Sequence, residues 1–292
     1  MVDGKHIGGH RTCSPLGNML PAGATVLAVR VSSMDDAELV EVLRDAASRV
    51  GQALAALDDW GLAGTRAGQY RSDLVADRAA VDVLTRAGLV VLSEESGLTE
   101  PAGTRASAGR RLVVVVDPVD GSTNAARHLP WYATSLCAVD EAGPRAAVVV
   151  NQASGVRYEA VRGAGATRDG APIRPSGCDT LGQAIVAMSG YPRRYLGWSQ
   201  YRSLGAAALD LCAVADGALD AYAVVGGSAL GSWDYLGGML VCTEAGASVS
   251  ELSGRTLVTL EHGDRRTPVA AATPELLGEL AAAVVGAEPA AP

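Results

Sequence analysis

One junction in the sequence constrains the fold more than any other feature. Residues 112–116 form a run rich in β-branched side chains, which predicts a buried central strand. The sequence DPVDG follows directly at residues 117–121. Strand ends and helix starts are where α/β proteins build their sites, so we expect a functional site at this junction.

The chemistry of the junction suits a metal ion and a phosphate group. Asp117 and Asp120 are three residues apart across a turn, so both carboxylates can lie on one side, with the carbonyl of Val119 between them. Such oxygens suit Mg²⁺. Gly121 allows a sharp bend, and residues 122–124 can then begin a helical turn whose free N–H groups suit a phosphate. DPVDG alone is also an ordinary turn sequence.

Two further acidic positions also lie where elements end or begin. Glu94 and Glu95 follow a short strand expected at residues 89–92, and Asp234 lies at the start of a helix expected from about Trp233. A Glu pair is usually a solvated edge, and a Trp-Asp pair alone says little. The three acidic positions together, after these elements, favour one shared site.

The remaining pattern predicts an α+β half at residues 34–175 and an α/β half at 176–292, with a crossover at 172–177. We expect residues 1–32 to be a flexible N-terminal extension, the alternative being a strand at residues 24–31. Helices are expected at 34–60 with a cap at Ser33, at 73–87 with a cap at Ser72, at 204–215 and at 274–285. Further strands are expected near 133–139, 145–151, 156–161, 184–188 and 219–225, and a loop at 99–110.

Four segments together resemble the inositol monophosphatase family, which is grouped with fructose bisphosphatases and other Mg²⁺-dependent, often lithium-sensitive phosphatases. They are SEE at 93–95, DPVDGSTN at 117–124, SLGAAA at 203–208, and WD at 233–234 followed by EAG at 244–246. The resemblance covers roughly residue 34 to the end. It implies a layered αβαβα sandwich of the inositol monophosphatase and fructose bisphosphatase type.

The resemblance also implies roles for individual residues. Glu94, Asp117 and the Val119 carbonyl would hold one Mg²⁺. Asp117, Asp120 and Asp234 would hold a second, and Glu94 would reach a weaker third ion. The N–H groups of Gly121 and Ser122 would bind phosphate, and the Ser122 hydroxyl, paired with Glu94, would orient the attacking water. Glu95, Asp77, Ala206, Arg193 and Arg194 are candidates for supporting these groups or contacting substrate.

The activity implied is hydrolysis of a small-metabolite phosphate (a sugar, cyclitol, histidinol or nucleotide phosphate) by metal-activated water attack. Two or three Mg²⁺ ions would act at each site, Mn²⁺ could replace them, and Li⁺ would inhibit. The alternatives are a fructose bisphosphatase, a nucleotide 3′-phosphatase, or a catalytically silent binding protein on the same fold.

The sequence departs from the family pattern at three places. Ser122 stands where the family usually has Thr, which keeps the hydroxyl. Residues 73–77 are shorter than the usual run, so Asp77 is either a supporting residue or a solvated helix side chain. No acid occurs between Tyr222 and Trp233, where inositol-specific members carry a Glu, and this argues against inositol phosphate. The adjacent Arg193 and Arg194 would contact a second anionic group or be solvated.

Composition excludes several other classes. The chain has 292 residues with 24 Lys+Arg against 32 Asp+Glu, a net charge of −8, and no basic cluster, so we expect no nucleic-acid partner. No apolar run approaches the ~20 residues of a membrane-spanning helix. Five cysteines without a CxxC pair argue against a disulfide framework or a zinc site. We expect a cytoplasmic protein and, from the family, a homodimer.

Overall fold

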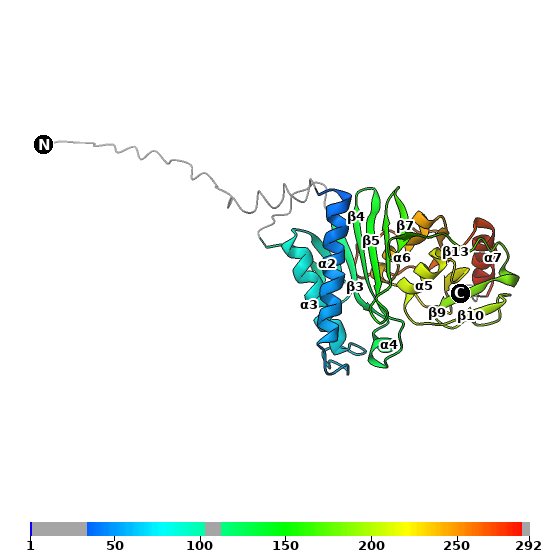
Figure 1. Cartoon of the computed structure of the whole chain (residues 1–292), viewed down its shortest axis with the longest axis horizontal. Helices are drawn as coiled ribbons and strands as arrows, with labels where there is room; N and C mark the ends of the chain where they lie inside the picture. The colour runs from blue at the N-terminus through cyan, green and yellow to red at the C-terminus, as the bar shows by residue number, and fades with distance from the viewer. Residues whose placement is uncertain (2–33, 103–111, 288–292) are drawn as a thin grey trace.

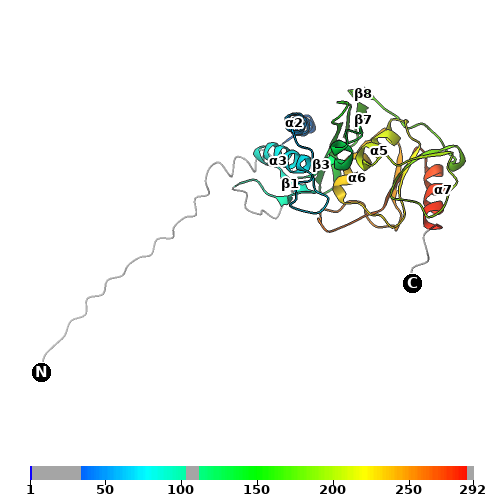
Figure 2. The ribbon, with the colours of Figure 1, turned by 90° about the horizontal axis from the view of Figure 1, so that it is seen from below.

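The computed structural model describes residues 34–102 and 112–287, together with Met1. The expected extension at 1–32, the alternative strand at 24–31 and most of the expected loop at 99–110 lie outside the described residues. Two β-sheets are stacked with helices between them and on both outer faces (Figures 1 and 2). This arrangement confirms the predicted layered αβαβα sandwich.

The first sheet has eight strands within the described part of the chain, in the order β2-β1-β3-β4-β5-β6-β7-β8. The strands are β1 (Val90–Ser93), β2 (Gly97–Thr99), β3 (Val113–Asp120), β4 (Ala133–Asp140), β5 (Gly143–Asn151), β6 (Arg157–Val161), β7 (Gly165–Arg168) and β8 (Ala171–Pro172). Helices α2 (Asp36–Ala55) and α3 (Arg71–Arg86) cover its outer face. Their apolar stripes close one of three hydrophobic cores against the strands.

The ends of α2 and α3 differ from the prediction. The cap predicted at Ser33 is wrong, because Asp35 accepts from the N–H of Glu38 at 2.8 Å while the Glu38 carboxylate reaches back to the N–H of Asp35. The cap predicted at Ser72 is also wrong. Asp73 accepts from the N–H of Tyr70 at 2.8 Å, so α3 begins two residues earlier than expected.

The second sheet has five strands in the described residues, in the order β10-β9-β11-β13-β12. They are β9 (Ile185–Ser189), β10 (Gln200–Arg202), β11 (Ala221–Val224), β12 (Ser248–Glu251) and β13 (Pro268–Ala271). Helices α5 (Ala207–Ala215) and α6 (Ser232–Ala245) fill the space between the sheets and form the largest core. Helix α7 (Pro274–Val285) covers the outer face, next to the short 3-10 helix η1 (Leu181–Gln183). No helix within the described residues is long and apolar enough to cross a membrane.

The junction at residues 112–121 lies in the interior of the first sheet, where β3 is flanked by β1 and β4. β3 does not end at Val116 as predicted but continues to Asp120, with a shift in its register against β4 between Asp117 and Asp120. Pro118 is tolerated in a central strand because it lies in this shift, where the missing N–H breaks no regular pairing. The turn is confined to Gly121, and the short helix α4 (Ser122–Ala126) follows it.

Candidate active site

Two of the predicted acidic positions meet because their strands are neighbours. β1 and β3 are parallel and pair with Ser93 opposite Val116. The next residues, Glu94 and Asp117, therefore lie side by side where β1 ends, and the N–H of Glu94 donates to the carbonyl of Val116 at 3.1 Å. Carboxyl ends of parallel strands are where such folds place their ligands.

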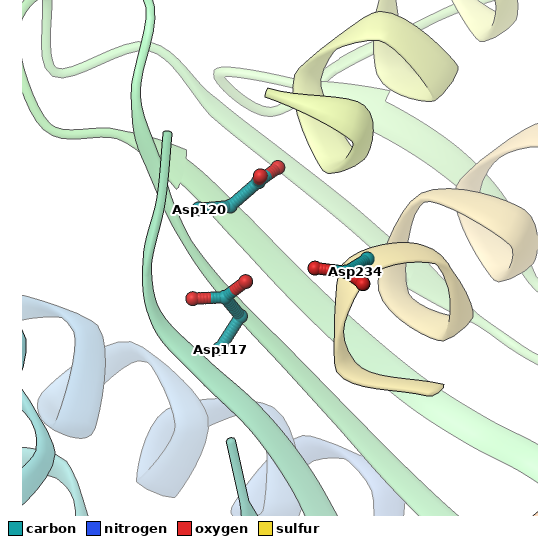
Figure 3. A group of neighbouring side chains, drawn as sticks. All are labelled: Asp117, Asp120 and Asp234. Atoms are coloured by element: carbon teal, nitrogen blue, oxygen red, sulfur yellow. The ribbon is translucent and has the colours of Figure 1, made fainter. Parts of the chain in front are cut away.

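The third acidic position arrives from the layer between the sheets. Asp234 lies in the first turn of α6 and accepts from the N–H of Gly231 at 2.7 Å, which closes the start of the helix. Its carboxylate faces those of Asp117 and Asp120 (Figure 3). One oxygen from each of the three carboxylates lies within 4.8 Å of the others. Residues from the two halves of the chain thus form one cluster.

Neutral backbone groups hold this cluster in place. The N–H of Val119 donates to Asp117 at 3.0 Å, and the N–H of Ala208, at the start of α5, donates to Asp120 at 2.7 Å. Both side chains are buried: Asp117 keeps 1% of its accessible surface and Asp120 keeps 7%. Within the described ranges, no Arg or Lys lies at ion-pair distance from Asp117, Asp120, Asp234 or Glu94.

The crowding of these buried charges is reflected in their ionisation. Burial, followed by repulsion from neighbouring carboxylates, raises the pKa of Asp117 and of Asp120 well above the ordinary range. The same two causes raise the pKa of Glu94 to about 8. Burial also raises the pKa of Asp234 to about 6, although the Gly231 N–H opposes the rise.

The donor set fits hard divalent cations. Buried carboxylates without a protein cation beside them require either protons or metal ions to balance their charge. Oxygen-only ligands of this kind are those that Mg²⁺ takes in proteins, whereas zinc usually recruits His or Cys. No His or Cys belongs to the cluster as described.

The turn after β3 places backbone N–H groups beside the cluster. Gly121 has φ +87°, and a Cβ there would lie 3.0 Å from the carbonyl oxygen of Gly205 and 3.1 Å from that of Trp131. The Asn124 side chain donates to the carbonyls of Trp131 and Leu204, each at 2.7 Å, and ties α4 to the same two segments. The N–H groups at Gly121 and Ser122 are therefore held in a rigid, crowded turn next to Asp120.

Comparison with known proteins decides the family. A model of the inositol monophosphatase family matches residues 35–288. The chain is a member of the inositol monophosphatase family. This membership makes it a phosphoric monoester hydrolase of a metal-dependent family, with a carboxylate cluster able to hold a metal ion.

Named relatives agree with this assignment. A fructose-1,6-bisphosphatase/inositol-1-monophosphatase of Archaeoglobus fulgidus is 31% identical over 234 residues, covering 77% of this chain and 88% of the relative. The inositol-1-monophosphatase SuhB of Mycobacterium tuberculosis is 34% identical over 228 residues, covering 72% and 74%. A Pyrococcus horikoshii protein with similarities to inositol-1 monophosphatase superposes with a TM-score of 0.70 at 25% identity, covering 84% of this chain and 96% of that one.

The supporting residues suggested by the family resemblance fall into two groups. Asp77 accepts from the hydroxyls of Ser93 at 2.5 Å and Ser96 at 3.1 Å, so it braces the turn that carries Glu94. Glu95 pairs with Arg66 at 2.8 Å. Ala206 lies against the Gly121 turn. In contrast, Arg194 follows β9 in the second sheet together with Arg193, and it donates to the carbonyl of Gly286 after α7 at 2.9 Å.

Sequence reasoning missed three residues in or near the site, two of which lie in a long loop. His262 and Arg265, between β12 and β13, lie beside Trp233 and line the same pocket as Glu94 and Ser122. Asp210 on α5 is fully buried and accepts from the indole N–H of Trp131 at 2.9 Å. Neither loop residue belongs to the four segments that carry the family resemblance, and no periodicity marks them, so only the folded chain identifies them.

Proposed function

We propose that this chain is a Mg²⁺-dependent phosphomonoesterase that hydrolyses a small-metabolite phosphate by attack of water. The observation that carries the proposal is the convergence of Asp117, Asp120 and Asp234 within 4.8 Å, next to the rigid Gly121 turn, in a member of this family. A carboxylate cluster beside free N–H groups offers a cation site and a phosphate site in contact.

The metal ligands in this proposal are Glu94, Asp117 and the carbonyl of Val119 for one Mg²⁺, and Asp117, Asp120 and Asp234 for a second. Glu94 would also reach a third. When bound, Mg²⁺ neutralises the carboxylates, polarises the phosphoryl oxygens and acidifies water that it contacts. Mn²⁺ would serve in its place, and Li⁺ would inhibit.

The chain's own groups then orient the reactants. The N–H groups of Gly121 and Ser122 donate to the phosphoryl oxygens and stabilise the charge that builds on them. The Ser122 hydroxyl and the Glu94 carboxylate hold the attacking water in line with the leaving oxygen. Asp77 keeps the Glu94 turn in position through Ser93 and Ser96. No covalent intermediate on the protein is required.

The segment before Trp233 bears on the substrate class. The segment between Tyr222 and Trp233 contains no acid, so the inositol hydroxyls would lack the partner that inositol-specific relatives supply. We therefore propose a sugar, histidinol, nucleotide or other cyclitol phosphate. A fructose bisphosphatase or a nucleotide 3′-phosphatase remains the alternative enzyme. The cytoplasmic location and the homodimer stay predictions.

A second candidate function is a binding role on the same fold. The Nus factor SuhB of Pseudomonas aeruginosa is 32% identical over 203 residues, covering 62% of this chain and 71% of that protein. A catalytically silent chain would bind Mg²⁺ and be stabilised by it, yet release no phosphate. The complete carboxylate cluster favours the hydrolase.

The test measures inorganic phosphate release from inositol, sugar, histidinol and nucleotide monophosphates, with Mg²⁺ and with a chelator. Asp120→Asn is the active-site variant, and it keeps an oxygen that can accept from Ala208. Asp82→Asn removes an exposed charge on α3 and serves as the control. We expect Mg²⁺-dependent release that Asp120→Asn lowers by orders of magnitude and Asp82→Asn leaves unchanged. Equal activity of a folded Asp120→Asn protein would refute the assignment.

A further inference from the structure

A pocket of about 300 Å³ opens beside the carboxylate cluster. Glu94 and Ser122, both part of the proposed machinery, are among the residues that line it. The segment before α3 contributes Arg66 and Gln69 to the lining, and the β12–β13 loop contributes His262 and Arg265. The leaving group of a phosphate ester held at Ser122 would therefore lie in a pocket lined by both segments.

The β12–β13 loop is built to hold a fixed shape. Glu251 accepts from Arg255 at 2.6 Å and from the hydroxyl of Thr267 at 2.9 Å, which joins the two ends of the loop. In its middle, Asp264 accepts from Thr259 at 2.7 Å and from Arg266 at 3.0 Å. Rigid presentation of a side chain lowers the entropy lost when a ligand binds it.

This loop holds Arg265 against Trp233 in the lining of the pocket. The guanidinium lies 5.1 Å from the ring centroid of Trp233, and the Trp233 ring also contacts the His262 ring at 4.7 Å. His262 in turn lies 3.0 Å from the carbonyl oxygen of Glu94.

The two arginines of the pocket differ in one respect. Arg66 has its charge balanced by Glu95 at 2.8 Å. Arg265 donates only to the carbonyls of His262 and Asp264, at 2.9 and 2.8 Å, and no carboxylate lies within 4.0 Å of it in the part of the chain that the structure describes. A guanidinium stacked on an aromatic ring, with its charge unpaired, is a ready partner for a carboxylate or phosphate.

We propose that Arg265 is a specificity residue that binds a second anionic group, a carboxylate or a phosphate, on the leaving-group side of the substrate. The inference rests on the proposed function, because the first phosphate must sit at Ser122 for the second anion to reach Arg265. Phosphomonoesters with neutral leaving groups would be hydrolysed without this contact and would show a higher KM.

The test compares matched substrates on wild type, Arg265→Gln and Arg265→Lys. 2-Phosphoglycerate has a carboxylate where glycerol 2-phosphate has a hydroxymethyl group, and fructose 1,6-bisphosphate has a second phosphate that fructose 1-phosphate lacks. Arg86→Gln, on the exposed end of α3, controls for net charge. We expect the wild type to favour the doubly anionic member of a pair by about 10-fold in kcat/KM, the usual worth of one charge-assisted contact.

Arg265→Gln should abolish that preference by raising KM for the doubly anionic substrate, with kcat and the singly anionic substrate changed by less than about twofold. Arg265→Lys should keep part of it. An equal loss of kcat/KM on both substrates of a pair would mean that Arg265 contacts the transferred phosphoryl group. An unchanged ratio of kcat/KM between the two substrates would mean that Arg265 has only a structural role. Either result overturns the inference. A wild type that releases no phosphate from any compound refutes the proposed function instead. Mg²⁺-dependent thermal shifts by 2-phosphoglycerate and glycerol 2-phosphate then test Arg265 by binding.

Discussion

Gly121 is the position where a single added methyl group should cost most. Its φ of +87° is strained for any residue with a Cβ, and the new Cβ would meet the Gly205 oxygen at 3.0 Å, the Trp131 oxygen at 3.1 Å and the Ala206 Cβ at 3.2 Å. Two of these neighbours are backbone atoms in hydrogen-bonded segments, so they cannot rotate away. Gly121→Ala therefore incurs both a conformational and a packing cost.

Gly170 separates the two costs. It lies in the β7–β8 turn with φ +81°, and a Cβ added there would have no atom within 4 Å. Each substitution to Ala should cost about 1–2 kcal/mol for the positive φ. Gly121→Ala should cost about 2 kcal/mol more for overpacking, which corresponds to about 4–8 °C in melting temperature.

The assay is thermal and urea unfolding of wild type, Gly121→Ala and Gly170→Ala, each in a chelator so that metal binding does not contribute. Phosphate release in Mg²⁺ is measured alongside. Gly121→Ala should also lose at least about 10-fold in kcat, because the displaced turn carries the proposed phosphate donors. Equal loss of stability in the two variants would refute the close approach of the Gly121 turn to Trp131 and Gly205.

Three other perturbations follow from the charges. Chelation should lower the melting temperature of the wild type, and Mg²⁺ at 100 times its Kd should raise the free energy of unfolding again by about 2.7 kcal/mol. Asp120→Asn should lose most of this stabilisation by Mg²⁺. An unchanged Mg²⁺ response in the variant would contradict the proposed ligand set. Burial alone would raise the pKa of Glu251, but hydrogen bonds from Arg255 and Thr267 lower it to about 2. Glu251→Gln should therefore lower the free energy of unfolding by up to about 3 kcal/mol at pH 7, and this loss should shrink as the pH falls from about 4.3 through 2. A loss of stability that is independent of pH in urea titrations would contradict this reasoning. Burial raises the pKa of Asp210 to about 7, although the hydrogen bond from Trp131 opposes the rise. The free-energy cost of ionising this buried carboxyl grows as the pH rises from about 4 to 7, so the stability of Asp210→Asn relative to wild type should be greater at pH 8 than at pH 5. The reverse trend would rule out a buried carboxyl that resists ionisation.

The sequence predicted the acidic positions because each follows a local signal. The β-branched run before Asp117, the short strand before Glu94 and the helix start at Asp234 are all readable from nearby residues. The extent of β3 could not be predicted in this way. A proline normally interrupts a central strand, and only the register shift against β4 makes Pro118 acceptable there. The helix caps were mispredicted because an aspartate that can close the helix start, Asp35 or Asp73, lies within two residues of each serine that the pattern favoured.

The pocket walls were beyond sequence reasoning for a different reason. Arg265 and His262 reach the site through a loop whose shape depends on the Glu251 and Asp264 contacts, none of which has a periodicity. Arg193 and Arg194 were the pair that the sequence offered for a second anion, yet the contact of Arg194 with Gly286 places it at α7. Local pattern identifies chemistry that lies on strand and helix ends, and tertiary contacts choose the groups around it.

Asp117 and Asp120 belong to the first sheet, whereas Asp234 lies on α6, so the cluster exists only once α6 has packed against the first sheet. A nascent or partly assembled chain is therefore chemically silent. A divalent ion bound by all three side chains would cross-link segments that are distant in the chain. Turnover then reports the completion of folding itself, and recovery of phosphate release after dilution from denaturant would time the final docking step.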